Sequence, residues 1–142
     1  MKHYFLLCCM LLAFSAATAQ TNDKALIETT INYYLEGTSY NKTDVIKKAF
    51  TKDATLYLKN RDGEDILWSI DFYADLFSKR EYGKYNGRKG TFLSVEVIND
   101  IATAQAEIIF ENTNKRYVDL FLLKRLNTNE WKIVSKTATV TN

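Results

Sequence analysis

Hydrophobic residues follow helical spacing in three segments of the chain. Positions three and four apart lie on one face of a helix, so apolar residues at these intervals predict an amphipathic helix with one buried side. The predicted inner faces are Ile27, Thr30, Ile31, Tyr34 and Leu35 in the first helix, Val45, Ile46, Ala49 and Phe50 in the second, and Phe72, Tyr73, Leu76 and Phe77 in the third.

The remaining segments alternate or are enriched in β-branched and aromatic residues, which predicts strands. Two short strands are expected between the second and third helices, and four long ones follow a polar loop. Short polar turns between the long strands predict antiparallel hairpins. The strands are Ala54–Lys59, Glu64–Trp68, Thr91–Asn99, Ile101–Glu111, Arg116–Leu126 and Trp131–Val140. The pattern favours the α+β class, with helices on one face of a curved, mostly antiparallel sheet.

The two faces of the predicted strands differ in character. In Ile101–Glu111 the even positions are small or apolar, whereas the odd positions include Thr103, Gln105, Glu107 and Glu111, which predicts one buried and one wetter face. In Tyr117–Leu126 both faces are largely apolar, including Leu120 and Leu122 on the face opposite Phe121. With all helices on one side of the sheet, a second subunit is the expected cover for the other. We therefore expect a homodimer through the open sheet face.

The first 19 residues have the layout of a secretory signal peptide. Lys2 and His3 precede the apolar run Phe5–Phe14, and Ala17-Thr18-Ala19 supplies small residues at a cleavage site before Gln20. The apolar run is too short for a membrane-spanning helix. We expect an exported protein, periplasmic or extracellular, whose mature chain is a single domain over residues 20–142 with no membrane segment.

Cleavage would remove both cysteines and the one histidine, because Cys8, Cys9 and His3 all lie in this segment. A mature chain without Cys or His has no disulfide, no thiolate or imidazole metal ligand and no Ser-His-Asp or Cys-His arrangement. No metal and no cofactor are therefore expected, and any proton transfer would use Asp, Glu, Tyr or Lys. The mature chain carries 18 basic and 17 acidic residues. This balance argues against nucleic acid as a partner.

The order of elements and three motifs resemble the NTF2-like superfamily, a cone-shaped α+β fold, and more narrowly its "putative lumazine-binding" group of small bacterial proteins. The motifs are Tyr33-Tyr34-Leu35-Glu36-Gly37, Ala49-Phe50 with Asp53-Ala54, and the long segment Tyr117–Lys136. The resemblance implies three N-terminal helices packed on the sheet and a cavity for a small molecule. The superfamily also includes ketosteroid-isomerase-like enzymes, SnoaL-like cyclases and non-catalytic binding domains. The fold alone does not determine which of these functions a member has.

Asp119 is the principal candidate residue, because it interrupts the apolar strand YVDLFLLK. If the odd positions face the interior, its carboxylate enters the cavity beside Tyr117 and Phe121. Three roles are open: a structural carboxylate paired with a tyrosine hydroxyl, a backbone N–H or a lysine; a group that binds a ligand; or a general base. Strict alternation along the last strand places Lys136 on the opposite face.

Aromatic residues with polar tips suit a flat, partly polar ligand. The residues expected to line the cavity are Tyr34, Tyr57, Trp68, Tyr73, Phe77, Tyr117, Asp119 and Trp131. Core packing is the alternative for each aromatic residue. The loop Lys79–Gly90 contains five basic residues and three glycines and is either a lid over the cavity or a solvated loop.

The leading functional hypothesis is an exported domain that binds a small, partly apolar molecule without transforming it. One alternative is an isomerase-like or cyclase-like enzyme with Asp119 as base and a tyrosine as donor to the developing oxyanion. The other is a structural or protein-interaction domain with a filled core. These differ in whether a cavity exists and in what surrounds Asp119.

Overall fold

The computed structural model describes residues 22–60 and 62–141. A first helix over residues 22–39 is followed by a second helix, two strands, a third helix and four long strands. The elements are α2 (Thr43–Ala49), β1 (Phe50–Lys59), β2 (Asp65–Ser69), α3 (Ile70–Ser78), β3 (Arg88–Ile98), β4 (Ile101–Phe110), β5 (Lys115–Arg125) and β6 (Trp131–Thr141). The predicted signal peptide, residues 1–19, lies outside the described residues.

The six strands form one sheet in the order β2-β1-β6-β5-β4-β3. The four long strands make successive antiparallel hairpins, as the sequence predicts, but β1 pairs with β6 in parallel. The α+β class is confirmed and the sheet is mixed. The expectation of three N-terminal helices needs correction, because α3 follows the first β-hairpin.

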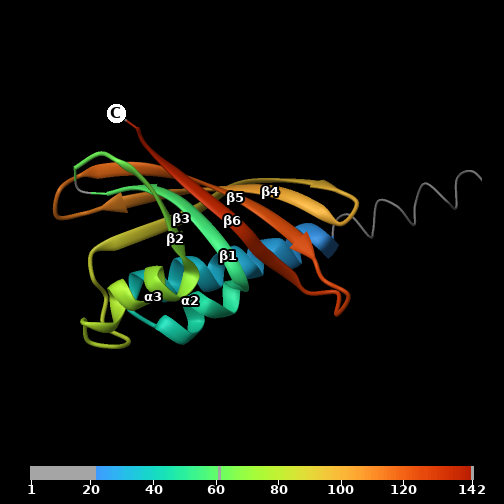
Figure 1. Cartoon of the computed structure of the whole chain (residues 1–142), viewed down its shortest axis with the longest axis horizontal. Helices are drawn as coiled ribbons and strands as arrows, with labels where there is room; N and C mark the ends of the chain where they lie inside the picture. The colour runs from blue at the N-terminus through green and yellow to red at the C-terminus, as the bar shows by residue number, and fades with distance from the viewer. Residues whose placement is uncertain (1–21, 61, 142) are drawn as a thin grey trace, which may run out of the picture.

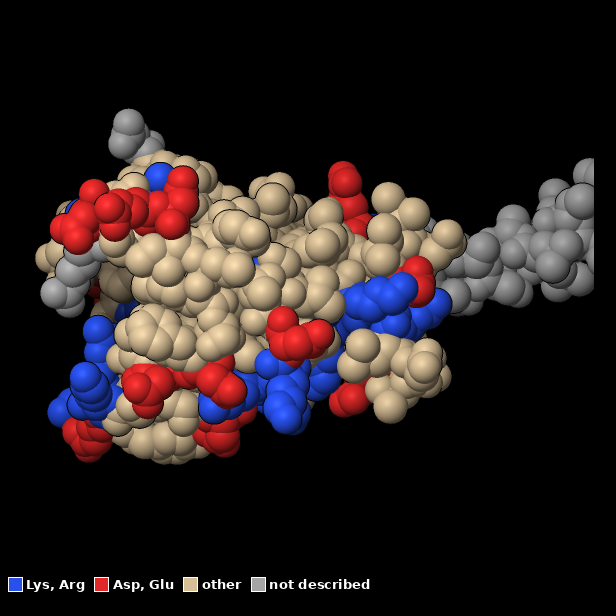
Figure 2. Space-filling model, in the orientation of Figure 1, with Lys and Arg blue, Asp and Glu red and all other residues tan. Residues whose placement is uncertain are grey.

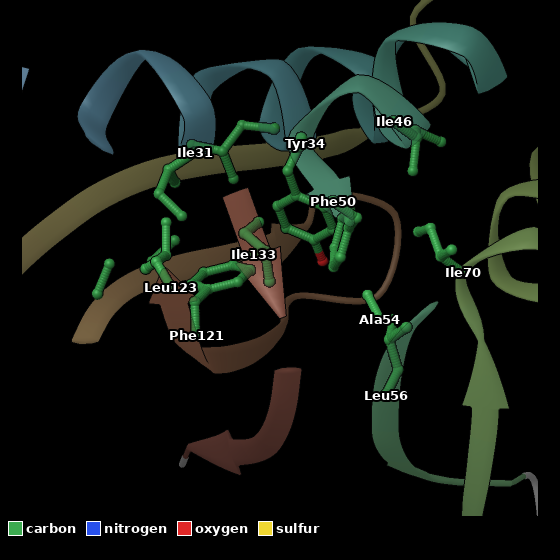
Figure 3. Close-up of a cluster of buried hydrophobic side chains, with 14 of the residues drawn as sticks. Ile31, Tyr34, Ile46, Phe50, Ala54, Leu56, Ile70, Phe121, Leu123 and Ile133 are labelled. Atoms are coloured by element: carbon green, nitrogen blue, oxygen red, sulfur yellow. The ribbon is translucent and has the colours of Figure 1, made fainter. Parts of the chain in front are cut away.

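All three helices cover one side of the sheet (Figure 1). The core lies between them and the concave face of the strands, and Figure 3 shows the ring of Tyr34 reaching from the first helix to Phe50 and Phe121. The ring centroids of Tyr34 and Phe121 are 5.1 Å apart in an edge-to-face arrangement, a preferred geometry for aromatic pairs. The alanines of β4 are buried, as their alternation predicts.

The first helix ends later than its glycine suggests. Gly37 lies inside the helix, where a Cβ would come within 2.7 Å of the backbone nitrogen of Ile46, so its role is the close approach of α2. Asn41, with φ of 56°, supplies the left-handed residue after the helix. Among the described residues, no helix is long and apolar enough to cross a membrane.

A bulge in β6 decides which of its residues face the core. Leu123 pairs with Ile133, but the preceding residue Leu122 pairs with Ser135, so β6 has one extra residue at this point. An extra residue reverses the alternation of side chains beyond it. Trp131 and Ile133 are buried before the bulge and Lys136 after it. The prediction that Lys136 lies on the opposite face is therefore wrong.

Candidate functional site

A buried ion-pair cluster lies on the concave face of the sheet, centred on Asp119. Asp119 is 2 % exposed, because its position in β5 is inward-facing together with Phe121 and Leu123. Lys136 on the adjacent strand β6 places its Nζ 3.0 Å from Oδ1 of Asp119. Arg88, the first residue of β3, places Nη2 3.5 Å from Oδ2. Two buried cations thus share one carboxylate.

Two tyrosines and a threonine extend this cluster into a hydrogen-bond network. Tyr34 donates its hydroxyl hydrogen to Oδ2 of Asp119 at 2.6 Å and accepts a bond from Nη2 of Arg88 at 2.7 Å. Nη1 of Arg88 donates to the hydroxyl of Thr38, which lies one helical turn after Tyr34. The hydroxyl oxygens of Tyr34 and Tyr73 are 3.1 Å apart. Since Tyr34 has a single hydroxyl hydrogen, Tyr73 donates in this contact.

Burial of Tyr34 raises the pKa of its hydroxyl well above the ordinary value. The nearby guanidinium of Arg88 opposes this increase, and the negative charge of Asp119 adds to it. Tyr34 is therefore protonated at neutral pH and serves as a permanent hydrogen-bond donor to the carboxylate. Tyr34 therefore has a structural role: it holds the carboxylate of Asp119 in the cavity wall.

The cluster forms one wall of a cavity of about 650 Å³. This volume lies within the range of pockets for small organic ligands, roughly 300–1,000 Å³. Most of the remaining wall is apolar or aromatic and comes from β1, β2, α3, β4, β5 and β6. Its lining residues include Leu58, Trp68, Tyr73, Leu76, Phe77, Ile108, Phe110, Tyr117 and Val140.

The structure brings five of the eight predicted residues together in the cavity lining: Trp68, Tyr73, Phe77, Tyr117 and Asp119. Tyr34 contacts Asp119 from behind and is fully buried. Tyr57 is 57 % exposed on the outer face of the sheet, because Leu56 and Leu58 take the inward positions of β1. The prediction that Tyr57 lines the cavity is therefore wrong.

Trp131 also lies away from the cavity. It is buried at the other end of the sheet, where its indole N–H donates to Asp23 of the first helix at 3.0 Å. Its ring also lies beneath the guanidinium of Arg125, at 5.8 Å from the ring centroid. Core packing, the alternative considered for each aromatic residue, describes Trp131.

Sequence reasoning missed the two cations of the site. Arg88 falls inside the basic segment for which the sequence leaves open a lid or a solvated loop, although the alternation Arg88, Gly90, Phe92 marks it as an inward strand position. Lys136 was missed because of the bulge. The loop itself is held by Asn41, whose side-chain amide donates to the carbonyl oxygens of Glu81 and Lys84 at 3.0 and 2.8 Å. These contacts favour a fixed loop over a moving lid.

Within the described residues, no group of His, Cys, Asp and Glu side chains is arranged to hold a metal ion. What the site offers is two cations, one carboxylate and tyrosine hydroxyls at the base of an aromatic cavity. This arrangement can bind a polar group at one end and a flat apolar group at the other.

A family model described as "Putative lumazine-binding" matches residues 22–138, which contain the whole cluster. The chain belongs to this family. The match confirms the resemblance inferred from the motifs. No curated protein matches the chain.

Solved structures show that the family's fold here is NTF2-like. An NTF2-like protein of unknown function from Shewanella baltica OS155 is similar at 18% identity and a TM-score of 0.73, over 86% of this chain and 96% of that chain. Another from Methylobacillus flagellatus KT has 24% identity and a TM-score of 0.71, over 85% and 94%. A ketosteroid isomerase-like protein from Erwinia carotovora atroseptica has 16% identity and a TM-score of 0.60, over 83% and 95%.

The cluster predicts a large stability difference between two Asp→Asn substitutions. Asp119→Asn leaves Arg88 and Lys136 buried without a counter-charge and is expected to lower the free energy of unfolding by about 3–5 kcal/mol, measured by urea denaturation. Asp100→Asn is the matched control, since Asp100 pairs with Lys124 at the surface, where both side chains are about half exposed. The control should leave the urea midpoint nearly unchanged. Equal effects of the two substitutions would refute the charge assignment.

Proposed function

We propose that the protein binds a small, partly apolar organic molecule in the cavity beside Asp119. The observation that carries this proposal is the aromatic cavity of about 650 Å³ with charged groups on one wall. A structural domain with a filled core, one of the alternatives, has no need of such a space. The family description names lumazine, a flat bicyclic heteroaromatic compound, and a flat ring system suits walls formed by Trp68, Tyr73 and Phe77.

The surroundings of Asp119 favour binding over catalysis. A general base needs a free carboxylate oxygen within reach of a substrate proton. Here Oδ1 faces Lys136, and Oδ2 accepts from Tyr34 and lies near Arg88. Tyr34 is itself occupied as a donor to this carboxylate and is not positioned to stabilise an oxyanion in the cavity.

A cavity-filling substitution tests the proposed binding site. Ala138 lines the cavity and pairs with Asp119 across the sheet, so Ala138→Phe places a ring in the cavity. Titration of lumazine and of naphthalene-2-carboxamide, followed by the fluorescence of Trp68, should show binding that weakens at least about tenfold in this variant.

Asn32→Phe, which adds the same ring on the exposed side of the first helix, is the control and should bind like the unmodified protein. Two results would contradict the proposal. One is that neither compound binds at millimolar concentration. The other is binding that Ala138→Phe leaves unchanged, because the compounds would then occupy another place.

We also propose that two copies pair through the outer face of the sheet. Leu120 and Leu122 at its centre and Leu93 on β3 are 43–49 % exposed there. The outward neighbours of Leu120 on the adjacent strands are Gln105 and Thr137, so a second copy would bury no charge at this point. In the view of Figure 2, charged side chains gather along the helical side, and few lie over the middle of the strands.

Light scattering at micromolar concentration should therefore give the mass of a dimer. Leu120→Glu places a charge in the proposed interface and should give a monomer. Leu26→Glu is the control, since Leu26 is equally exposed, at 41 %, but lies on the first helix. A monomer before substitution, or a dimer insensitive to Leu120→Glu, would show that the face has another role.

Export is the third part of the proposal, and it is supported by the N-terminal sequence pattern alone. Expression of the full chain in a bacterial host should yield a product whose intact mass equals that of a chain beginning at Gln20, with or without cyclisation of this residue. Ala19→Arg should block cleavage, because the position before the cut requires a small residue, whereas Thr18→Ala should not. A product that retains residues 1–19 in the membrane-free fraction would disprove export by this route.

A further inference from the structure

We infer that the ligand of this cavity is an organic anion, specifically an aromatic or alicyclic monocarboxylate whose carboxylate is bound by Arg88 and Lys136. This inference rests on the proposed binding function and specifies the class of ligand. It is carried by the balance of charge in the cavity wall, which differs from the near-neutral balance of the whole chain.

The cavity lining contains four cations and a single carboxylate. Arg88 and Lys136 are buried at the base, Lys59 and Arg80 are exposed at the rim, and Asp119 is the carboxylate. Lys59 is paired with Asp65 outside the lining, at 2.8 Å. The buried part alone thus holds two positive charges against one negative charge. An excess charge away from water is costly, and an anion in the cavity would neutralise it.

Both buried cations have capacity for a further acceptor. An ammonium carries three N–H donors, and within the described residues the polar partner of Lys136 is one oxygen of Asp119. Its Nζ also lies 5.6 and 5.8 Å from the ring centroids of Tyr34 and Tyr73, contacts that accept no conventional hydrogen bond. Arg88 donates one bond each from Nη1 and Nη2, whereas a guanidinium has five N–H donors.

The geometry favours a monoanion with a flat, apolar body. The buried cluster has one positive charge in excess. A single carboxylate balances this charge, whereas a phosphate dianion would leave a net negative charge. Guanidinium groups bind planar carboxylates with favourable geometry. The remaining walls are apolar or aromatic, so the part of the ligand that follows the carboxylate is expected to be a ring system.

Three naphthalenes of nearly equal shape separate charge from fit: naphthalene-2-carboxylate, naphthalene-2-carboxamide and naphthalene-2-carboxamidinium, with charges of −1, 0 and +1. Calorimetric titration at pH 7 should show the carboxylate binding at least about tenfold more tightly than the carboxamide, and the carboxamidinium most weakly. Equal affinity for carboxylate and carboxamide would overturn the inference while leaving the binding function in place. Failure of all three to bind would contradict the binding function itself.

Substitutions assign the preference to particular side chains. Lys136→Met removes one cation while Arg88 still faces Asp119, and it should cost the carboxylate about tenfold in affinity but change that of the carboxamide less than about threefold. Equal losses for both compounds would show that Lys136 acts through packing and not through charge.

Two substitutions at surface residues test the inference if the Lys136→Met variant does not fold. Arg80→Gln removes an exposed cation at the rim of the cavity, and Lys79→Gln removes its neighbour, which lies outside the lining. Arg80→Gln should weaken carboxylate binding about two- to fivefold at low salt, and the effect should shrink as salt increases, whereas Lys79→Gln should have no effect. Identical behaviour of the two variants, together with equal affinities across the naphthalene series, would refute an anionic ligand.

Discussion

The carboxylate of Asp119 is the group on which the interior of this molecule depends. It lies where the first helix, β3, β5 and β6 converge, and it contacts a side chain from each of the other three: Tyr34, Arg88 and Lys136. Without it, two cations would lie in the interior with no counter-charge, an arrangement that is among the most destabilising single changes to a protein core. Hydrogen bonds from Tyr34 to Asp119 and from Arg88 to Tyr34 thereby join the first helix to the sheet, in addition to packing.

Much of the fold follows from local patterns. The long strands are rich in apolar, β-branched and aromatic residues, and short polar turns connect them, so their existence and antiparallel pairing were predictable. The parallel pairing of β1 with β6 was not, because it joins segments about eighty residues apart, such as Leu56 and Lys136, and no local signal specifies the partner. The position of α3 after the first hairpin was visible in the sequence pattern, but the resemblance to a family described it more loosely.

The carboxylate and the aromatic residues of the candidate site were predictable from the sequence, and the two cations were not. Asp119 stands out in its strand because it interrupts an apolar run, and Trp68, Tyr73, Phe77 and Tyr117 follow from inward positions on their elements. Its partners were hidden by two features of backbone geometry. The bulge after Ile133 reverses the alternation that would otherwise place Lys136 outside, and Arg88 reaches the cluster from a strand that lies beyond β4 in the sheet. A single extra residue in β6 thus decides whether a lysine is part of the site.

The same cluster links stability to binding. A buried ion pair contributes little net stability compared with hydrophobic residues of equal volume, so folding alone does not explain two cations and a carboxylate in the interior. Their position at the base of an aromatic cavity supplies a second reason, because an incoming anion would complete the charge balance that Asp119 leaves one unit short. A ligand that binds the folded state and not the unfolded chain stabilises the fold by RT ln(1 + c/Kd), where c is the free ligand concentration, so its stabilising effect grows with ligand concentration. If an anion fills the cavity as proposed, the free-energy cost of the excess buried charge in the empty protein would be recovered on binding and would contribute to the affinity.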